Sequence, residues 1–216
     1  LSNLADRRLA RAEVTLPVAL LTTDDIDGAE VAERIAAAWR FAWADPYRAA
    51  THNKGVMNGV DAVALATGND WRAIEAGAHA FSCRDGQYRP LTTWRVLDSG
   101  ALHGVIEIPS QFGMVGGAIR LHPTVRENLA MMDIQNATQL GGIAAAVGLA
   151  QNLGALRALT TEGIQAGHMR MHARTVAATV GAEGSEIDTV TSALCADRVF
   201  STSHARDVLK QLRAKA

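Results

Sequence analysis

Cysteine is scarce in this sequence. Cys83 and Cys195 are the only two among 216 residues, and they stand in no CxxC or metal-ligand spacing. A disulfide scaffold is therefore excluded, and we expect two free thiols in a reducing compartment. Neither sign of charge is in excess, because 21 basic residues face 22 acidic ones. This balance gives no support to a nucleic acid as partner.

Long hydrophobic runs are also lacking. No uninterrupted apolar run reaches the roughly 18 residues that a membrane span needs, so we expect no membrane association. The segment Leu1–Arg8 has charges where a signal peptide would have its apolar core. We therefore expect a cytoplasmic location. Because the chain begins with Leu rather than Met, we expect it to belong to a longer protein.

Lysine is the rarest basic residue. Lys54 is the only lysine in the first two hundred residues, and Lys210 and Lys215 lie in the polar C-terminal tail. A site that needs a compact ammonium group rather than a planar guanidinium would explain this pattern. A GC-rich genome together with chance would explain it equally well.

Local patterns predict an α+β fold with a helical C-terminal region. Apolar spacing predicts a helix over residues 29–44 that ends at Asp45-Pro46, followed by a loop over residues 47–59. The other expected elements are an extended stretch over Val14–Leu21 with Pro17 at a sheet edge, a buried strand over Val60–Ala66, a helix from Asp70 to about Cys83, a hairpin of Tyr88–Val96 and Leu102–Ile108, a helix opened by His122-Pro123, and helices from there to the end.

The segment Thr51–Gly59 gathers groups that could carry chemistry. It holds a hydroxyl, two amides, two glycines and the ammonium group of Lys54. A loop of this kind can bring backbone and ammonium close to an oxygen that becomes negative during a reaction. The alternative is a solvated loop with an ordinary surface lysine.

Asp70 follows Lys54 by 16 positions. A strand of about seven residues between them would span roughly 23 Å. The two side chains can therefore meet only if the loop folds back, or if Asp70 faces the Lys54 of another subunit. The alternative function of Asp70 is to cap the helix that follows it.

Two further pairs are candidates. His168 and His172 share a helix face, which is a zinc-compatible spacing, but HExxH is absent and no third ligand is indicated. The other interpretations are a single histidine that titrates near a reacting group and a histidine that only packs against neighbours or caps a helix. Gln151 and Asn152 are amides in an apolar helical stretch, and they bind either nearby backbone or a ligand.

Taken together, these segments resemble class II (bacterial) hydroxymethylglutaryl-CoA (HMG-CoA) reductases. The similarity is collinear along nearly the whole chain and is greatest for the NAD-using bacterial enzymes that degrade mevalonate. The segments that carry it are Asp45–Gly55, Ala66–Ala73, Glu75–Ala80, Leu91–Trp94, Val115–Ala118, Gly148–Ala155 and Gly163–Met169.

The resemblance implies an oxidoreductase that interconverts HMG-CoA and mevalonate plus coenzyme A by two hydride transfers. It implies that Lys54 stabilises the oxyanion at the thioester carbon, that Asp70 tunes the protonation of this lysine cluster, and that His168 protonates the departing CoA thiolate. NAD is the implied cofactor, with NADP as the alternative. The implied assembly is a homodimer with its active site at the subunit interface, or a higher oligomer.

The resemblance also implies a set of binding residues. Asn3 matches an asparagine close to the nicotinamide. The residues that match substrate-binding positions are Arg48, Thr51, Asn58, Gln151 and Asn152.

The implied architecture is helices around a mixed sheet in residues 1–160, the C-terminal portion of the substrate-binding domain. A small all-helical domain of residues 161–216 then carries His168. The family's catalytic glutamate and dinucleotide-binding domain have no counterpart in this sequence, so we expect the chain alone to be inactive. One alternative is a catalytically silent CoA-ester-binding or oligomerisation module. Another is a metal-dependent lyase that uses His168 and His172.

Overall fold

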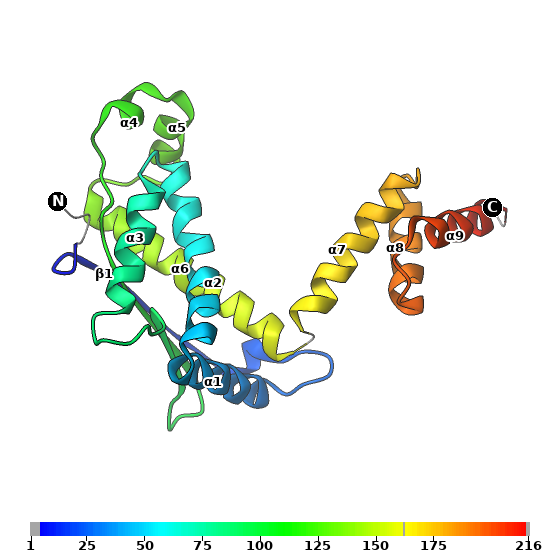
Figure 1. Ribbon diagram of the computed structural model, residues 1–216, viewed down its shortest axis with the longest axis horizontal. Coiled ribbons are helices and arrows are strands. Elements are labelled where there is room, and N and C mark those ends of the chain that lie inside the picture. The colour runs from blue at the N-terminus through cyan, green and yellow to red at the C-terminus, as the bar shows by residue number, and fades with distance from the viewer. Residues whose placement is uncertain (1–4, 162, 215–216) are drawn as a thin grey trace. The chain divides into compact units, whose positions relative to one another are not determined.

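The computed structural model describes residues 5–161 and 163–214. The described residues up to Thr160 form one compact unit, and those from Thr161 onward form a second. The fold is α+β, as the sequence predicted, with a three-stranded sheet among helices in the first unit and helices alone in the described part of the second (Figure 1).

The elements follow the expected order, with two exceptions. The expected extended stretch over Val14–Leu21 ends at Leu16, because Val18–Leu21 form a 3-10 helix, and residues 46–66 form a helix. The first unit contains β1 (Leu9–Leu16), the 3-10 helix η1 (Val18–Leu21), α1 (Gly28–Ala44), α2 (Pro46–Ala66), α3 (Trp71–Ser82), β2 (Thr92–Val96), β3 (Leu102–Pro109), α4 (Gly117–Leu121), α5 (Pro123–Met131) and α6 (Ala137–Thr160). The second contains α7 (Ile164–Thr179), α8 (Ser185–Asp197) and α9 (Thr202–Ala214). The expected first helix, hairpin and C-terminal helices are confirmed.

The sheet is antiparallel rather than mixed. Its strand order is β1-β3-β2, and both outer strands run antiparallel to β3 in the part of the chain that the structure describes. The prediction of a mixed sheet is wrong here because β2 and β3 form a hairpin, while β1 pairs along all of β3 from Leu9 opposite Pro109 to Leu16 opposite Leu102. Pro17 directly follows β1, an edge strand, as expected.

Residues 46–66 form one continuous helix, α2, so the predicted loop over 47–59 and strand over Val60–Ala66 are both wrong. The Asp45 side chain caps the helix by accepting a hydrogen bond from the Tyr47 N–H at 2.9 Å, and Pro46 occupies the first turn. No proline interrupts the helix after this start. Of the apolar run that resembles a strand, Val60, Val63 and Ala64 are buried, whereas Ala62, Leu65 and Ala66 are exposed.

Glycines allow α2 and α6 to pack very closely. An ideal Cβ at Gly59 of α2 would lie 2.8 Å from the Val147 carbonyl oxygen and 3.0 Å from Cβ of Gln151. On α6, a Cβ at Gly148 would lie 2.8 Å from a methyl group of Val60. Gly59, one of the two glycines that favoured a loop in the sequence, is therefore a helix-packing residue.

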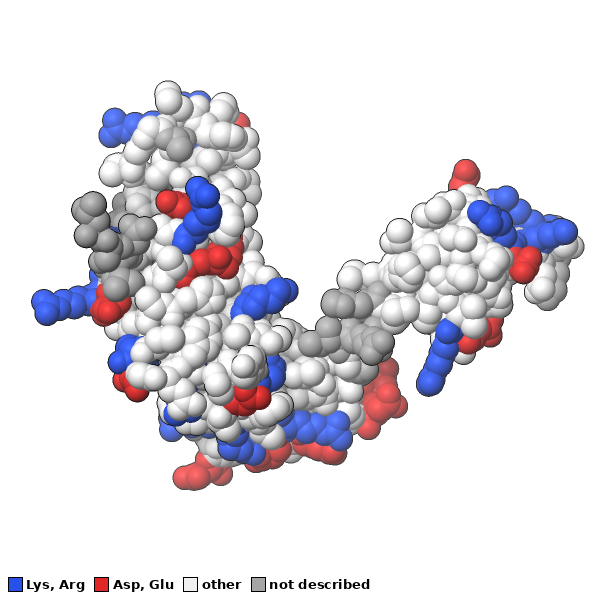
Figure 2. Space-filling model, in the orientation of Figure 1, with Lys and Arg blue, Asp and Glu red and all other residues white. Residues whose placement is uncertain are grey.

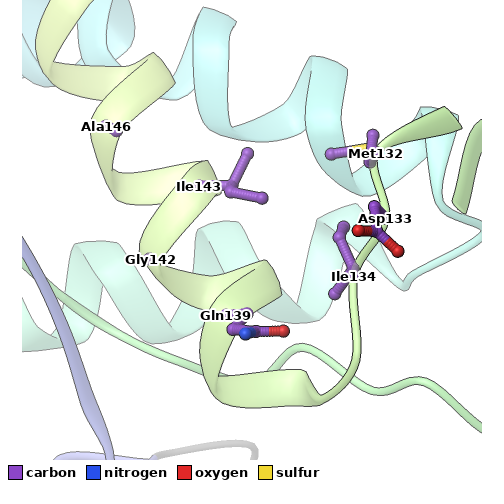
Figure 3. A pocket seen from close by; sticks show the side chains of 7 residues that line it. All are labelled: Met132, Asp133, Ile134, Gln139, Gly142, Ile143 and Ala146. Carbon is purple, nitrogen blue, oxygen red and sulfur yellow. The ribbon is translucent and has the colours of Figure 1, made fainter.

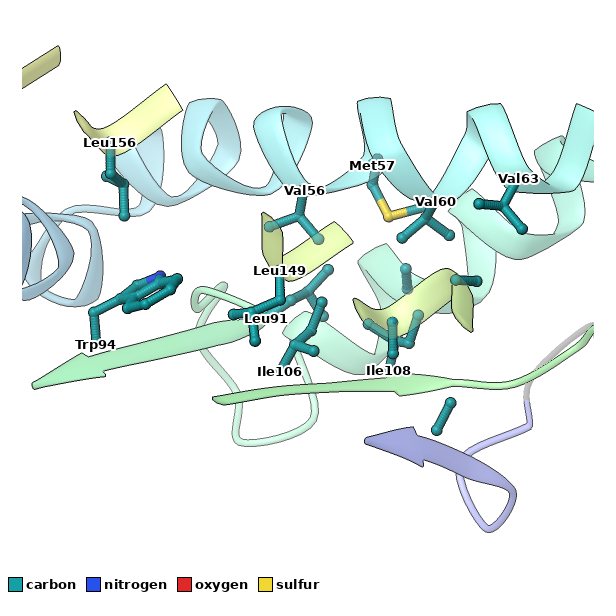
Figure 4. Close-up of a cluster of buried hydrophobic side chains, with 14 of the residues drawn as sticks. Val56, Met57, Val60, Val63, Leu91, Trp94, Ile106, Ile108, Leu149 and Leu156 are labelled. Carbon is teal, nitrogen blue, oxygen red and sulfur yellow. The ribbon is translucent and has the colours of Figure 1, made fainter. Parts of the chain in front are cut away.

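The core lies between α2, α6 and the sheet. Helix α6 packs against α2 on one side and against β1 and β3 on the other, and apolar side chains from α2 and the strands converge between these layers (Figure 4). Trp94 of β2 is fully buried, and its ring covers Gly104 of β3 so closely that a Cβ there would lie 2.2 Å from the ring. The sheet thus fixes the position of α6, and α6 helps to fix the position of α2.

Helix α6 is also the one described helix that is long and apolar enough to cross a membrane by length and composition. A third of its most apolar window, 33%, is buried inside the structure. This is weak support for a membrane span, because the core helix of a globular domain passes the same test, and α6 packs against the sheet and α2.

The second unit has an apolar cluster of its own, built from α7, α8 and α9. The Arg213 guanidinium of α9 makes two hydrogen bonds of 2.8 Å to the Glu186 carboxylate of α8. The buried members of the cluster are Ala173, Val176, Ala177, Ala182, Val190, Leu194, Ala205 and Leu209.

We predict that Gly59→Ala destabilises the first unit by about 1–3 kcal/mol, because the added methyl group meets the α6 backbone and overpacks the contact. Gly154→Ala is the matched control, since a Cβ there meets nothing within 4 Å, and we expect it to stabilise α6 by about 0.5–1 kcal/mol. Urea unfolding followed by tryptophan fluorescence measures both, because all four tryptophans lie in the first unit. Equal effects of the two substitutions would contradict close α2–α6 packing.

Candidate functional site

One exposed face of α2 presents three of the predicted site residues. Thr51, Lys54 and Asn58 are spaced by three and four positions, so they lie on the same side of the helix, and all three are exposed. The Thr51 hydroxyl donates to the Tyr47 carbonyl oxygen at 3.3 Å. The structure therefore places an ammonium, an amide and a hydroxyl on one rigid helix rather than on a loop.

Gln151 of α6 borders this face. It is exposed, and its Cβ lies 3.0 Å from where a Gly59 side chain would begin. Arg48 lies about two turns before Lys54 and is half-buried. Its Nη1 atom is buried without a hydrogen-bond partner, and burial lowers the pKa of the guanidinium. Arg48, Thr51, Lys54 and Asn58 thus lie on one helix, and Gln151 lies beside Gly59 of that helix.

Asn152 faces the core instead of this surface. It is 1% exposed, and its Oδ1 atom accepts hydrogen bonds from Trp94 Nε1 at 2.8 Å and from the Thr92 hydroxyl at 3.0 Å. The sequence left open whether this amide binds nearby backbone or a ligand. The structure shows neither, because the partners are side chains of β2. These bonds fix α6 against β2.

His52 is a residue that the sequence analysis did not single out. It is 2% exposed, and its Nε2 atom lies 2.6 Å from the Thr92 hydroxyl. Its Nδ1 atom is buried without a partner. Burial, together with the nearby positive charge of Arg48, lowers the pKa of His52 to about 3. His52 is therefore a neutral imidazole at every physiological pH.

A pair of carboxyl groups was also missed. Asp61 lies one turn beyond Asn58 on α2, and it shares a hydrogen bond with Glu75 of α3. Burial, and then the charge and hydrogen bond of Glu75, raise the pKa of Asp61 to about 7. The pair thus holds a proton below about pH 7. The separation of 14 positions across a turn gave no local signal of this contact.

Asp70 lies four residues beyond the C-terminal end of α2, at the start of α3. Its side chain caps α3 by accepting from the Ala73 N–H at 3.1 Å, as the alternative interpretation predicted. Twelve residues of continuous helix separate Lys54 from Ala66, or roughly 18 Å at 1.5 Å per residue. A loop that folds back is therefore excluded, and within one chain the structure does not bring Asp70 to Lys54.

Two predicted site residues cannot be placed. Asn3 lies outside the described residues, and so does the side chain of His168, although its backbone belongs to α7. On the same helix, the His172 ring packs at 6.5 Å between centroids against Phe200. Among the described residues no group of three or more metal-ligating side chains occurs.

Two pockets lie away from these residues. One, of about 390 Å³, is lined mainly by apolar side chains of α6 and the segment before it, among them Met132, Ile134 and Ile143 (Figure 3). The other, of about 310 Å³, lies on the outer face of the sheet and includes Arg11 and Arg95. On the visible face of the first unit, acidic and basic side chains are interspersed (Figure 2).

Comparison with known proteins gives consistent matches. The family model for hydroxymethylglutaryl-coenzyme A reductase matches residues 1–173. The 3-hydroxy-3-methylglutaryl-coenzyme A reductase of Archaeoglobus fulgidus is 50% identical over 214 residues, which are 99% of this chain and 48% of the relative. A probable enzyme of the same name from Borreliella burgdorferi is 40% identical over 172 residues, which are 80% of this chain and 40% of the relative.

Solved structures agree. The 3-hydroxy-3-methylglutaryl-coenzyme A reductase from Streptococcus pneumoniae is similar with a TM-score of 0.72 at 43% identity, over 98% of this chain and 51% of that chain. The class II enzyme from the same organism, bound to NADPH in open conformations, gives a TM-score of 0.68 at 44% identity, over 95% of this chain and 50% of that chain. The chain thus spans about half the length of its relatives.

We predict that the Asp61–Glu75 pair makes stability fall with rising pH. The folded Asp61 carboxyl keeps its proton up to about pH 7, whereas the unfolded carboxyl loses it near pH 4. Between these values the folded state binds more protons, so the free energy of unfolding decreases as the pH rises and levels off above both pKa values. Asp61→Asn should abolish this decrease and exceed the wild type in stability at pH 8.

Urea unfolding at pH 5 and pH 8 measures the effect. Asp98→Asn, in the exposed turn between β2 and β3, is the control, and we expect it to retain the wild-type difference between the two pH values. A wild-type chain that is as stable at pH 8 as at pH 5 would contradict proton sharing by Asp61.

Proposed function

Because the chain belongs to the hydroxymethylglutaryl-CoA reductase family, as its motifs predicted, we propose that its parent protein interconverts HMG-CoA and mevalonate plus coenzyme A. The observation that carries the proposal is the family match over residues 1–173, which includes Lys54 and its neighbours on α2. We further propose NAD as the cofactor, with NADP as the alternative, and a role in mevalonate degradation in the cytoplasm. A bound nicotinamide would supply or accept the hydride.

Lys54 is the proposed oxyanion-stabilising group. When hydride adds to the thioester carbon, the carbonyl oxygen gains negative charge, and an ammonium group held beside it lowers the energy of that state. Lys54 is suited to this because α2 is a rigid, tightly packed helix, so the ammonium starts from a fixed backbone position. Asn58, one turn further along the same face, would donate a second hydrogen bond.

The acyl part of the substrate would lie along the contact of α2 and α6. Arg48 has a half-buried guanidinium, and its several N–H donors suit a carboxylate. Thr51 and Gln151 are both exposed and would bind the remaining oxygens of the acyl group. Asn152, which is buried, would contribute by holding α6 in register with β2, in addition to any contact with substrate.

Asp70 supports the proposed homodimer. Its side chain is separated from the Lys54 of its own chain by most of α2. If Asp70 tunes the protonation of Lys54, it must therefore do so for the Lys54 of a partner subunit. The proposed active site thus lies at a subunit interface, in a homodimer or a higher oligomer.

The remaining roles rest on the resemblance. His168, at the beginning of α7, is the proposed acid that protonates the CoA thiolate, since a histidine titrates near neutral pH. Without this proton the thiolate could add back to the aldehyde. Asn3 is the proposed neighbour of the nicotinamide. We expect the 216-residue chain alone to be inactive, and the alternative function is a silent CoA-ester-binding or oligomerisation module.

The assay that tests the proposal is HMG-CoA-dependent oxidation of a reduced nicotinamide by the full-length protein. We predict that Lys54→Arg lowers the rate by about 10²–10³, the usual effect of losing one oxyanion donor. The larger, planar guanidinium keeps the charge but cannot occupy the place of a compact ammonium. Arg72→Lys on α3, also exposed, is the control. No turnover by the wild-type protein would refute the proposed function, and activity of Lys54→Arg near the wild-type value would remove Lys54 from it.

A second prediction concerns the subunit interface. Lys54→Ala and Asp70→Ala should each be inactive as pure homodimers. In a mixed dimer one site combines the two intact residues, so unfolding and refolding the variants together should restore roughly a quarter of the wild-type activity in a symmetric dimer. Absence of any recovery after verified subunit exchange would place the two residues in one chain or outside the site.

A further inference from the structure

Four buried polar groups form a continuous chain between β2, α2 and α6. The Trp94 indole N–H and the Thr92 hydroxyl both donate to Oδ1 of Asn152, and the hydroxyl also lies 2.6 Å from Nε2 of His52. Each of these residues is at most 2% exposed. Inside a protein such a chain is stable only if every member finds a donor or acceptor of the opposite kind.

The proton positions in this chain follow from its first member. An indole N–H can only donate, so the atom of Asn152 that faces Trp94 must be the oxygen. That oxygen can only accept, so the single proton of the Thr92 hydroxyl points to it. The hydroxyl oxygen then accepts from His52, which must carry its proton on Nε2. The Nδ1 atom of His52 is therefore a bare acceptor.

This bare acceptor lies near a donor that also lacks a partner. Nδ1 of His52 and Nη1 of Arg48 are both buried without hydrogen bonds. The two residues are four positions apart on α2, so their side chains are neighbours on the helix. The charge of Arg48 is close enough to contribute to the low pKa of His52. A bond between the two atoms would satisfy both.

We propose that His52 is a positioning residue for Arg48: its Nδ1 atom, kept free of a proton by the chain from Trp94, accepts a hydrogen bond from the Arg48 guanidinium and holds it toward the substrate. Torsions of the flexible arginine side chain bring the donor onto the acceptor. This role rests on the proposed function of Arg48 as a carboxylate-binding residue. It couples that residue to the packing of α6 on β2.

Two substitutions of His52 separate this role from a structural one. Asparagine places its amide where Nδ1 lies and retains an acceptor for Arg48, but it loses the bond to Thr92. Glutamine places its amide where Nε2 lies and retains the bond to Thr92, but it loses the acceptor for Arg48. We therefore expect a crossed pattern of stability and binding in the full-length enzyme.

His52→Gln should have the higher melting temperature but raise the KM for HMG-CoA about tenfold, the value of one charge-assisted hydrogen bond. His52→Asn should have the lower melting temperature, because it loses the bond to Thr92. Its KM for HMG-CoA should stay within about threefold of the wild-type value, because it keeps the acceptor for Arg48. A purely structural histidine predicts that His52→Asn is worse in both respects, and that result would overturn the proposal.

Nitrogen NMR of the histidine rings gives a test without turnover. In the wild-type protein the His52 ring should be protonated at Nε2 alone from pH 8 to pH 5. Arg48→Met should move the Nδ1 resonance, whereas Arg72→Met should not. A proton on Nδ1, or an Nδ1 resonance that ignores Arg48, would overturn the proposal even if the enzyme is active. An inactive wild-type enzyme with the expected spectra would instead refute the proposed function.

Discussion

The close contact between α2 and α6 is the constraint on which the rest of the first unit depends. Two helices approach this closely only where side chains are absent. Gly59 of α2 and Gly148 of α6 have no side chain at the contact. The contact brings Gln151 of α6 beside Gly59 of α2. Helix α6 in turn packs on the sheet, so the position of the lysine is set by packing rather than by a flexible loop.

The sequence predicted most elements of this fold because their signals are local. Asp70 as a helix cap, the hairpin around Gly100 and the helix opened by His122-Pro123 are all decided within a few residues. The error at residues 47–66 has a physical cause. Glycine and polar residues favour a loop only if nothing packs on them, but Gly59 packs on α6. Of the polar residues, Thr51, Lys54 and Asn58 face outward, whereas His52 and Asn53 are buried.

Sheet direction and site geometry could not be predicted in the same way. Antiparallel pairing of β1 with β3 joins residues about ninety positions apart, and no local pattern encodes it. The motifs identified the residues of the α2 face, but not that Asn152 is buried or that His52 and Asp61 have displaced pKa values. Those properties arise from neighbours on other elements, which only a three-dimensional arrangement supplies.

The polar chain from Trp94 to His52 joins α2, α6 and β2 inside an otherwise apolar core. A single buried amide can be placed with either end inward, but two donors from β2 leave Asn152 only one orientation. Polar groups in a core cost stability unless they are paired, and when fully paired they specify one arrangement over its alternatives. This arrangement fixes the rotation of α6 about its axis. Because His52 of α2 belongs to the same chain and α6 meets α2 at the glycine contact, these hydrogen bonds also fix the orientation of the helix that carries Lys54.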